Sequence, residues 1–343
     1  MAKKLGVGIV GTGWVSGEHV KAYQRNPHTE VRGICGRTKE GAQRLAASTG
    51  LSCPTFTDYS EMLKRDDIHI ISICTPNHLH AQEAIGAAEA GKHILIEKPA
   101  ALNTKELVAM RKAVKKARVK TVVSFVLRWN PLFETIKSLL ADDALGRIFY
   151  AEVDYFHGIG PWYKQYAWNI KKKVGGSSLL SAGCHAVDGL RWFVGDEVVE
   201  VSSYSTRGNG KHFKEYEYDP TSVAILKFKK GAVGKVASCV ESKMPYVFNI
   251  GLYGDKGSVR NNQLYSHKLP GQTGFATIPT ILPDSGDVTH HPFQGEMNHL
   301  VDCILSNKES HVNLEDAFKT HEIIFAADYS ARTGRPVKLP FIK

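Results

Sequence analysis

Residues 7–20, VGIVGTGWVSGEHV, join a short apolar run to a glycine-rich loop and then to a segment with helical spacing. Gly11, Gly13 and Ser16 occupy the positions of a G-x-G-x-x-G/A loop, in the strand-to-helix context that makes such a match informative. The glycines allow a tight turn and a close approach of backbone to an anion, at which the N–H groups of the following helix point. The stretch therefore predicts a dinucleotide-binding loop, and the residues expected to hold the pyrophosphate are Gly11, Thr12, Gly13, Trp14 and Val15.

The first third of the chain repeats this β-α pattern. Short apolar or β-branched runs, typical of strands buried on both faces, occur at 5–10, 31–35, 69–75, 93–96 and 121–126. Segments with helical spacing lie between them at 17–25, 39–47, 59–64, 79–90 and 104–117. The alternation predicts an α/β fold with a doubly wound parallel sheet, and hence an N-terminal Rossmann domain over residues 1–127.

The pattern changes from about Arg128 onward. A helix expected at 131–140 is followed by long β-rich stretches with turn residues at 230–231 and 255–257, and helices are expected near 293–305 and 314–333. We expect residues 128–343 to form an α+β substrate and oligomerisation domain with a mostly antiparallel open sheet. Its final helix could pack back on the first domain.

Composition and charge indicate an ordinary globular protein. The 343 residues include 44 Lys plus Arg and 34 Asp plus Glu, a formal net charge of +10. Because the excess is scattered, it predicts a solvated surface or mild attraction of an anionic cofactor or substrate, and not nucleic-acid binding. No run is long enough to span a membrane, the N-terminal apolar run is too short and too broken by glycines for a signal peptide, and the six cysteines form no C-x-x-C pair. These features predict a cytoplasmic protein with reduced thiols.

The stretch THHPFQGEMNH contains histidine and glutamate side chains that could in principle bind a metal ion. Its candidate ligands are His290, His291, Glu296 and His299. Their spacing matches no zinc signature, so we expect no metal.

The end of the second predicted strand bears on the choice of dinucleotide. In this kind of fold an Asp or Glu about 20 residues beyond the glycine loop holds the ribose 2′-hydroxyl of NAD. Here Gly36 stands at the strand end, followed by Arg37, Thr38 and Lys39. No carboxylate of this segment repels a 2′-phosphate and Arg37 could clamp one bidentately, which favours NADP. Arg37 could equally stack on the adenine of either dinucleotide, so NAD stays possible.

Polar residues also follow the third predicted strand. Thr75, Pro76 and Asn77 lie where backbone and amide groups would line the nicotinamide side of the crevice. His80 stands at the start of the next helix, where closing this loop is a more ordinary role than catalysis. We expect all four residues to belong to the cofactor site.

The fourth predicted strand ends in an unusual way. In HILIEKPAAL, residues 93–102, a buried run delivers Glu97 and Lys98 side by side before Pro99. A lone Glu-Lys pair is ordinarily a surface ion pair, but charges are usually kept off strand ends that face a core. A cation fixed at the carboxyl end of a strand can instead stabilise a developing alkoxide.

Two segments suggest where a substrate binds. Arg128, Trp129 and Asn130 follow the last strand of the first domain, and Trp162 and Tyr163 lie in a loop rich in Gly and Lys. Aromatic faces with flanking donors suit the apolar face and hydroxyl rim of a sugar or cyclitol ring. The same aromatics could simply pack a loop onto the sheet or onto a neighbouring subunit. Arg128 could also bind a carboxylate or phosphate group, so an acidic or phosphorylated sugar is a further possible substrate.

The whole chain resembles the Gfo/Idh/MocA oxidoreductases, the family that includes glucose-fructose oxidoreductase and inositol dehydrogenase. The resemblance rests on GIVGTGWVS, ISICTPNHLHAQEAIGAAEAGKHILIEKPAAL, FVLRWNP, GGSSLLSAGCHAVDGLRW, HPFQGEMNHLVDCI and LEDAFKTHEIIFAADYSARTGRPVKL. It implies a Rossmann domain followed by an α/β domain whose open sheet often supports oligomers, so a homodimer or homotetramer is expected.

The resemblance also implies catalytic roles. In the family the lysine of E-K-P contacts both the cofactor and the reacting substrate hydroxyl, which assigns Lys98 to that role and makes Glu97 an orienting residue. The family segment D-x-x-x-H has a histidine acid/base assisted by an aspartate. His185 matches the histidine, while Ser181 stands where the aspartate would be. On a helix Ser181, His185 and Asp188 would share one face.

The function expected from these residues is hydride transfer between NADP or NAD and a C–OH/C=O pair of a sugar, cyclitol or related polyol. Lys98 would polarise the substrate oxygen and His185 would transfer the proton. Ser181 would contribute to the substrate site beside His185. Its replacement of the aspartate leaves two alternatives: a redox-neutral sugar-processing enzyme with tightly bound cofactor, or a non-catalytic NADP-binding regulator.

Overall fold

The strand β1 (Leu5–Val10) lies inside a parallel sheet in the computed structural model, which describes residues 4–283 and 290–342. The chain divides into two units. The first contains the described residues of Met1–Val126 and Val288–Phe318, and the second those of Leu127–Asp287 and Lys319–Lys343.

The first unit is built on a six-stranded parallel sheet in the order β3-β2-β1-β4-β5-β6. Its other strands are β2 (Thr29–Cys35), β3 (Thr55–Phe56), β4 (Ile70–Ile73), β5 (His93–Ile96) and β6 (Thr121–Val123). The predicted doubly wound sheet is confirmed. The sequence did not predict β3, because a two-residue strand leaves no periodic signal.

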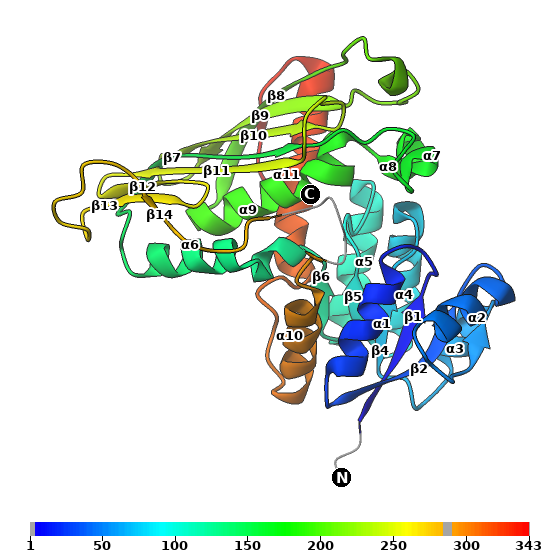
Figure 1. The fold of residues 1–343 in the computed structure, drawn as a ribbon. Helices are drawn as coiled ribbons and strands as arrows, with labels where there is room; N and C mark the ends of the chain where they lie inside the picture. The colour runs from blue at the N-terminus through cyan, green and yellow to red at the C-terminus, as the bar shows by residue number, and fades with distance from the viewer. Residues whose placement is uncertain (1–3, 284–289, 343) are drawn as a thin grey trace. The chain divides into compact units, whose positions relative to one another are not determined.

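Two layers of helices cover this sheet (Figure 1). The contacts α1·α2 and α1·α10 define one layer, and α3·α4 and α4·α5 define the other. The helices are α1 (Ser16–Arg25), α2 (Lys39–Ser48), α3 (Tyr59–Leu63), α4 (His80–Glu89), α5 (Thr104–Ala117) and α10 (Phe293–Leu305), with a 3₁₀ turn η1 (Asn77–Leu79). Because helices cover both faces, every residue of β4 is buried, as the continuous apolar run predicted.

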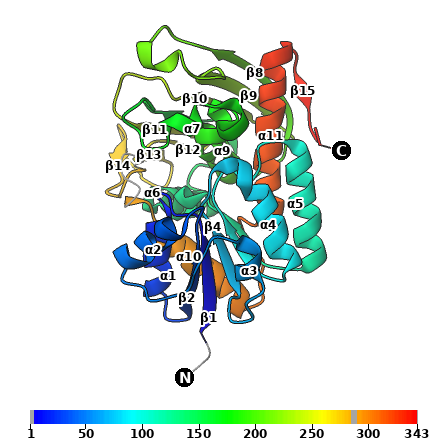
Figure 2. The same cartoon turned by 90° about the vertical axis from the view of Figure 1, so that its right-hand side faces the viewer.

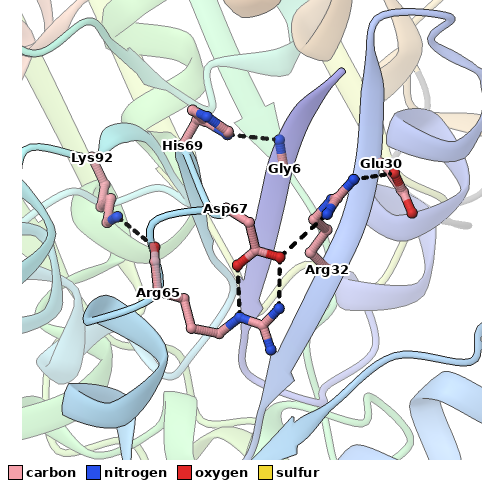
Figure 3. A network of polar contacts seen from close by, with 7 residues as sticks. All are labelled: Gly6, Glu30, Arg32, Arg65, Asp67, His69 and Lys92. Atoms are coloured by element: carbon pink, nitrogen blue, oxygen red, sulfur yellow. Dashed lines mark hydrogen bonds and ion pairs between the residues drawn. The ribbon is translucent and has the colours of Figure 1, made fainter. Parts of the chain in front are cut away.

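A network of ion pairs lies at the amino-terminal edge of this sheet (Figure 3). Arg65 donates to the Asp67 carboxylate at 2.8 and 2.6 Å, and Arg32 donates to it at 3.3 Å. The two arginines hold the pKa of Asp67 well below its usual range. Beside them the backbone N–H of Gly6 donates to His69 Nδ1 at 2.9 Å. This edge is therefore closed by structural contacts, and ligands of such sheets bind at the opposite, carboxyl-terminal edge.

The second unit contains a nine-stranded sheet in the order β14-β13-β12-β11-β7-β10-β9-β8-β15. Only the β7–β10 pairing of these described strands is parallel, so the predicted mostly antiparallel sheet is confirmed. The strands are β7 (Ile148–Phe156), β8 (Val198–Thr206), β9 (Thr221–Phe228), β10 (Val233–Cys239), β11 (Val247–Gly254), β12 (Gly257–Arg260), β13 (Gln263–Ser266), β14 (Ala276–Thr277) and β15 (Val337–Lys338).

One face of this sheet carries helices, and α9 packs against β7 and β10 (Figures 1 and 2). The other face is open, because β9 alternates buried residues with the exposed Val223, Ile225 and Lys227. The helices are α6 (Pro131–Ala141), α7 (Tyr166–Asn169), α8 (Lys172–Gly175), α9 (Cys184–Val194) and α11 (Leu314–Thr333), with 3₁₀ turns η2 (Val126–Trp129) and η4 (Lys211–Phe213) and a π-helical turn η3 (Leu179–Gly183).

Within the described residues, no helix combines the length and the apolar character that a membrane crossing requires.

Candidate functional site

The loop after β1 makes the tight turn that the sequence predicted. Gly11 has a φ of +101°, and its N–H donates to the Cys35 carbonyl at 2.9 Å. A Cβ atom at Gly11 would lie 2.5 Å from the carbonyl oxygen of Cys74, so only glycine fits between β1 and the end of β4. Gly13, by contrast, has one heavy atom within 4 Å of an added Cβ, the Cys74 oxygen at 4.0 Å.

The start of α1 has the features of an anion site. Thr12 and Gly13 are exposed, Trp14 and Val15 are half-buried, and no side chain among the described residues caps the first turn of the helix. Uncapped N–H groups behind an open glycine loop suit the pyrophosphate of a dinucleotide. The residues of this chain therefore fit an NAD(P) cofactor at the carboxyl edge of the sheet.

Arg37, Thr38 and Lys39 lie exposed at the carboxyl end of β2, where the ribose of a dinucleotide is held in such folds. The Thr38 hydroxyl caps α2 by accepting from the Gly41 N–H at 3.1 Å. Thr12 packs against the same region, since a Cβ on Gly36 would lie 2.7 Å from its methyl group. The glycine loop and the two cationic side chains thus border one edge of the sheet.

His80 links the loops that follow β4 and β5. Its side chain is fully buried, with Nδ1 2.8 Å from the Pro99 carbonyl oxygen and Nε2 2.8 Å from the Thr75 carbonyl oxygen. Burial lowers its pKa, although both carbonyls favour the protonated ring. His80 therefore fixes the position of the segment that carries Lys98, which is the loop-closing role expected of it.

The other polar groups of this loop are also held by protein. The Thr75 hydroxyl donates to Glu83 Oε2 at 2.6 Å, and burial raises the pKa of Glu83 to about 7. Pro76 is half-buried, and the buried Asn77 begins η1.

Glu97 and Lys98 directly follow β5, and Glu97 belongs to a hydrogen-bonded cluster. Its Oε1 lies 3.1 Å from His19 Nε2 and 3.0 Å from Ser124 Oγ, and its Oε2 accepts from the backbone N–H of Lys98 at 3.2 Å. Burial opposes ionisation, but His19, the Lys98 charge and Ser124 together lower the pKa of Glu97. These contacts and the Lys98 charge favour the ionised form of Glu97, at the same sheet edge as the glycine loop.

In the second unit, His185 lies at the start of α9 and is buried, with 6% of its surface exposed. The predicted continuous α-helical face through Ser181 is wrong, because residues 179–183 form a π-helical turn. Such turns are rare and occur often at functional sites. The Ser181 hydroxyl lies 3.4 Å from the hydroxyl of Tyr218, which donates to the Asn169 carbonyl at 2.9 Å.

Asp188 is bound to Arg128 in a buried pair. Arg128 Nε and Nη2 lie 2.7 and 2.6 Å from the two carboxylate oxygens, and both side chains are 2% exposed. The Thr320 hydroxyl donates to Asp188 Oδ1 at 3.0 Å. Asn130 is also buried and caps α6 by accepting from the Leu132 N–H at 3.0 Å, while Trp129 is half-buried. Arg128 and Asn130 therefore make structural contacts that the sequence did not indicate.

Trp162 and Tyr163 differ in exposure. Trp162 is 63% exposed, and its Nε1–H donates to the Gly158 carbonyl at 3.1 Å. Tyr163 is half-buried with its ring edge-on to His157, and burial raises its pKa to about 12.

Three members of the Glu97 cluster were not found by sequence reasoning as functional residues: His19, Ser124 and Glu296. Ser124 Oγ lies 3.0 Å from Glu296 Oε2 as well as from Glu97, and Glu296 was considered only as a metal ligand. No sequence signal could have joined residues 172 positions apart. No group of potential metal ligands occurs in the part of the chain that the structure describes.

Comparison with known proteins places both units in one family. Residues 5–125 match the family model described as "Oxidoreductase family, NAD-binding Rossmann fold", and residues 137–339 match "Oxidoreductase family, C-terminal alpha/beta domain". Levoglucosan dehydrogenase of Pseudarthrobacter phenanthrenivorans is 29% identical over 308 residues, covering 80% of this chain and 77% of that protein. The scyllo-inositol 2-dehydrogenase (NAD(+)) of Bacillus subtilis is 26% identical over 341 residues, covering 99% and 97%. A solved structure of levoglucosan dehydrogenase in complex with NADH has a TM-score of 0.88 at 25% identity, covering 98% of this chain and 99% of that one.

Proposed function

The chain belongs to the Gfo/Idh/MocA family of oxidoreductases with an NAD-binding Rossmann fold, and on that premise we propose that it transfers hydride between NADP and a C–OH/C=O pair of a sugar, cyclitol or related polyol. The observation that carries the proposal is the position of Lys98 directly after β5, where its backbone N–H donates to Glu97 Oε2 and His80 binds the carbonyl of the next residue, Pro99. The dehydrogenases to which the chain is similar are named for carbohydrate and cyclitol substrates.

In the proposed oxidation, Lys98 donates a hydrogen bond to the substrate hydroxyl and stabilises the negative charge that develops on its oxygen. His185 accepts the hydroxyl proton as the C–O bond gains double-bond character. A nicotinamide cofactor bound at the glycine loop would supply the hydride acceptor, and the reaction would yield a carbonyl compound, reduced cofactor and one proton. Arg128 and Asp188 hold the helix that carries His185 rather than contacting the sugar directly.

The proposed preference for NADP rests on the exposed Arg37 and Lys39 at the end of β2. The two cations and the N-terminus of α2 can neutralise a 2′-phosphate, whereas NAD offers only a hydroxyl there. Dissociation constants of both cofactors, measured by calorimetry, test this preference. NADP is expected to bind more tightly and to lose its advantage in Arg37→Ala, and equal or tighter binding of NAD would contradict the assignment.

Ser181, Trp129, Trp162 and Tyr163 complete the proposed substrate side, because the hydroxyl and the aromatic groups suit a polyol ring. The open face of the large sheet, with exposed side chains such as Tyr204, Val223 and Ile225, suits the homodimer or homotetramer that we also propose. The six free cysteines fit a reducing compartment, so we place the protein in the cytoplasm.

Substitutions at the two proposed catalytic residues test the mechanism. Lys98→Met and His185→Gln should each lower kcat by about 10²–10⁴ with wild-type thermal stability, which is the usual contribution of such groups. A His185→Ala variant with full turnover would refute its role as acid/base.

A further inference from the structure

Two carboxyl groups share one serine hydroxyl in the first unit. Ser124 Oγ, after β6, lies 3.0 Å from Glu97 Oε1, at the end of β5, and 3.0 Å from Glu296 Oε2, on α10. A serine hydroxyl carries one proton, so it can donate to only one of these carboxyl groups. The second short contact is a hydrogen bond only if the other carboxyl group is protonated and donates to the serine oxygen. The geometry therefore requires at least one of the two acids to be neutral.

The surroundings of the two acids decide which one carries the proton. Glu97 accepts from His19 Nε2, from the Lys98 backbone N–H and from Ser124, and its side chain keeps 13% exposure. Glu296 is fully buried, and apart from Ser124 none of the described residues donates to it, so its Oε1 has no partner there. Burial and the Glu97 charge raise the pKa of Glu296 well above its usual value. Each difference favours ionised Glu97 and neutral Glu296.

We propose that Glu296 is a positioning residue whose protonated carboxyl group donates to Ser124, so that Ser124 donates to Glu97 and keeps Glu97 as the single anion beside Lys98. The hydrogen bonds then run in one direction, from Glu296 through Ser124 to Glu97. This inference deepens the proposed hydride transfer and rests on it for its catalytic consequence. Its structural part, the location of the proton, stands independently.

The titratable and charged groups around the pair come from each element packed on it. They are His19 and Tyr23 on α1, Cys74 after β4, His80 on α4, and Lys98 after β5. Burial raises the pKa of both the Tyr23 phenol and the Cys74 thiol, so both remain neutral. Within this described cluster, Lys98 is the charge that complements an anionic Glu97.

The infrared spectrum of the purified full chain tests where the proton lies. We expect the C=O stretch of a protonated carboxylic acid to persist at alkaline pH, above the values of about 7 to which burial raises the pKa of Glu83 and Asp328. Glu296→Gln should remove this band, and Glu83→Gln, the matched control, should leave it. The assignment is overturned if the band survives in Glu296→Gln or disappears in Glu97→Gln while the protein stays folded.

Kinetics on the same variants test the catalytic consequence. Glu97→Gln removes the anion and should lower kcat/KM on the order of tenfold to a hundredfold, since one partner of a charge pair is lost. Ser124→Ala removes a donor to Glu97, so the pKa of Glu97 should rise and the acid limb of the kcat/KM profile should move to higher pH. Glu296→Gln keeps a neutral donor to Ser124, so its acid limb should stay near the wild-type position.

The opposite ranking, with Glu296→Gln shifting the profile more than Ser124→Ala, would overturn the positioning role. If the wild-type chain oxidises no polyol, the proposed function fails, and the infrared result alone decides the assignment of the proton.

Discussion

Three glycines in and after the β1 loop should respond differently to the same added methyl group. At Gly11 the new Cβ would lie 2.5 Å from the Cys74 carbonyl oxygen and 2.7 Å from its carbon, and φ is +101°. At Gly13 the nearest atom is 4.0 Å away, and at Gly17 nothing lies within 4 Å. The three alanine variants therefore separate a packing role from a ligand-binding role.

For Gly11→Ala we expect a loss of stability. The backbone conformation costs about 1–2 kcal/mol for a residue with a Cβ, and the overlap with Cys74 adds about 1–3 kcal/mol. Together they lower the free energy of unfolding by about 2–5 kcal/mol and the Tm by about 5–15 °C. Cofactor affinity should fall as well, because the loop must shift.

For Gly13→Ala the Tm should change little, because no atom opposes the new methyl group. That group would stand where the pyrophosphate approaches, and an overlap of about 1–3 kcal/mol raises the cofactor Kd about 5- to 150-fold. Gly17→Ala is the matched control: it should bind cofactor normally and gain about 0.5–1 kcal/mol of helix stability. Calorimetric scans and cofactor titrations of all three variants provide the assay. Normal cofactor binding by Gly13→Ala would refute the assigned position of the pyrophosphate.

Substitutions at three further positions test the electrostatics of the two units. Arg128→Met should lower the free energy of unfolding in urea by about 3–5 kcal/mol, because it leaves Asp188 buried without its partner. Arg128→Lys should lose less stability because it keeps the charge, and equal losses in the two variants would contradict this charge-pair argument. Asp67→Asn should lower the free energy of unfolding by about 1 kcal/mol or less, because the Asp67 side chain is 34% exposed. The pKa of Asp67 is lowered in the folded state, so its contribution to stability is present above the unfolded pKa of about 4 and is lost as the pH falls below that value. An Asp67→Asn variant with the same acid stability as the wild type would count against the network. Glu83 should change stability with pH in the opposite direction, because burial raises its folded pKa from 4.5 to about 7. The free energy of unfolding should fall as the pH rises between these two values. In urea titrations at several pH values, Glu83→Gln should make this dependence on pH weaker.

The sequence could predict the features that depend on neighbouring residues. The glycine loop, the β-α alternation and the turn residues act locally, so their positions followed from spacing alone, and the helix predicted at 104–117 is confirmed to the residue. The strand β3 and the π-helical turn at Ser181 were not predicted, because tertiary packing rather than periodicity sets them. A π-helical turn differs from an α-helical turn by a hydrogen bond that spans one more residue, and this difference does not change the pattern of apolar residues in the sequence.

The polar partners of the candidate site were the least predictable part. Arg128 and Asp188 lie 60 positions apart, and Ser124 and Glu296 lie 172 apart. Their pairing depends on which strand ends and helices the fold brings together. The sequence could identify Glu97 and Lys98 as unusual, but the hydrogen bonds that make Glu97 an anion became visible only in the folded chain.

Nicotinamide absorbance under single-turnover conditions tests most directly whether this protein transfers hydride between the cofactor and a polyol. The purified chain, loaded with NADP or NAD, is mixed with a panel of cyclitols, aldoses, glycosides and sugar acids. We expect one chemical group of the panel to reduce the cofactor, faster with NADP than with NAD, and Lys98→Met to slow this reduction by about 10²–10⁴-fold. Tight cofactor binding with no reduction by any member of the panel would contradict hydride transfer to or from a polyol.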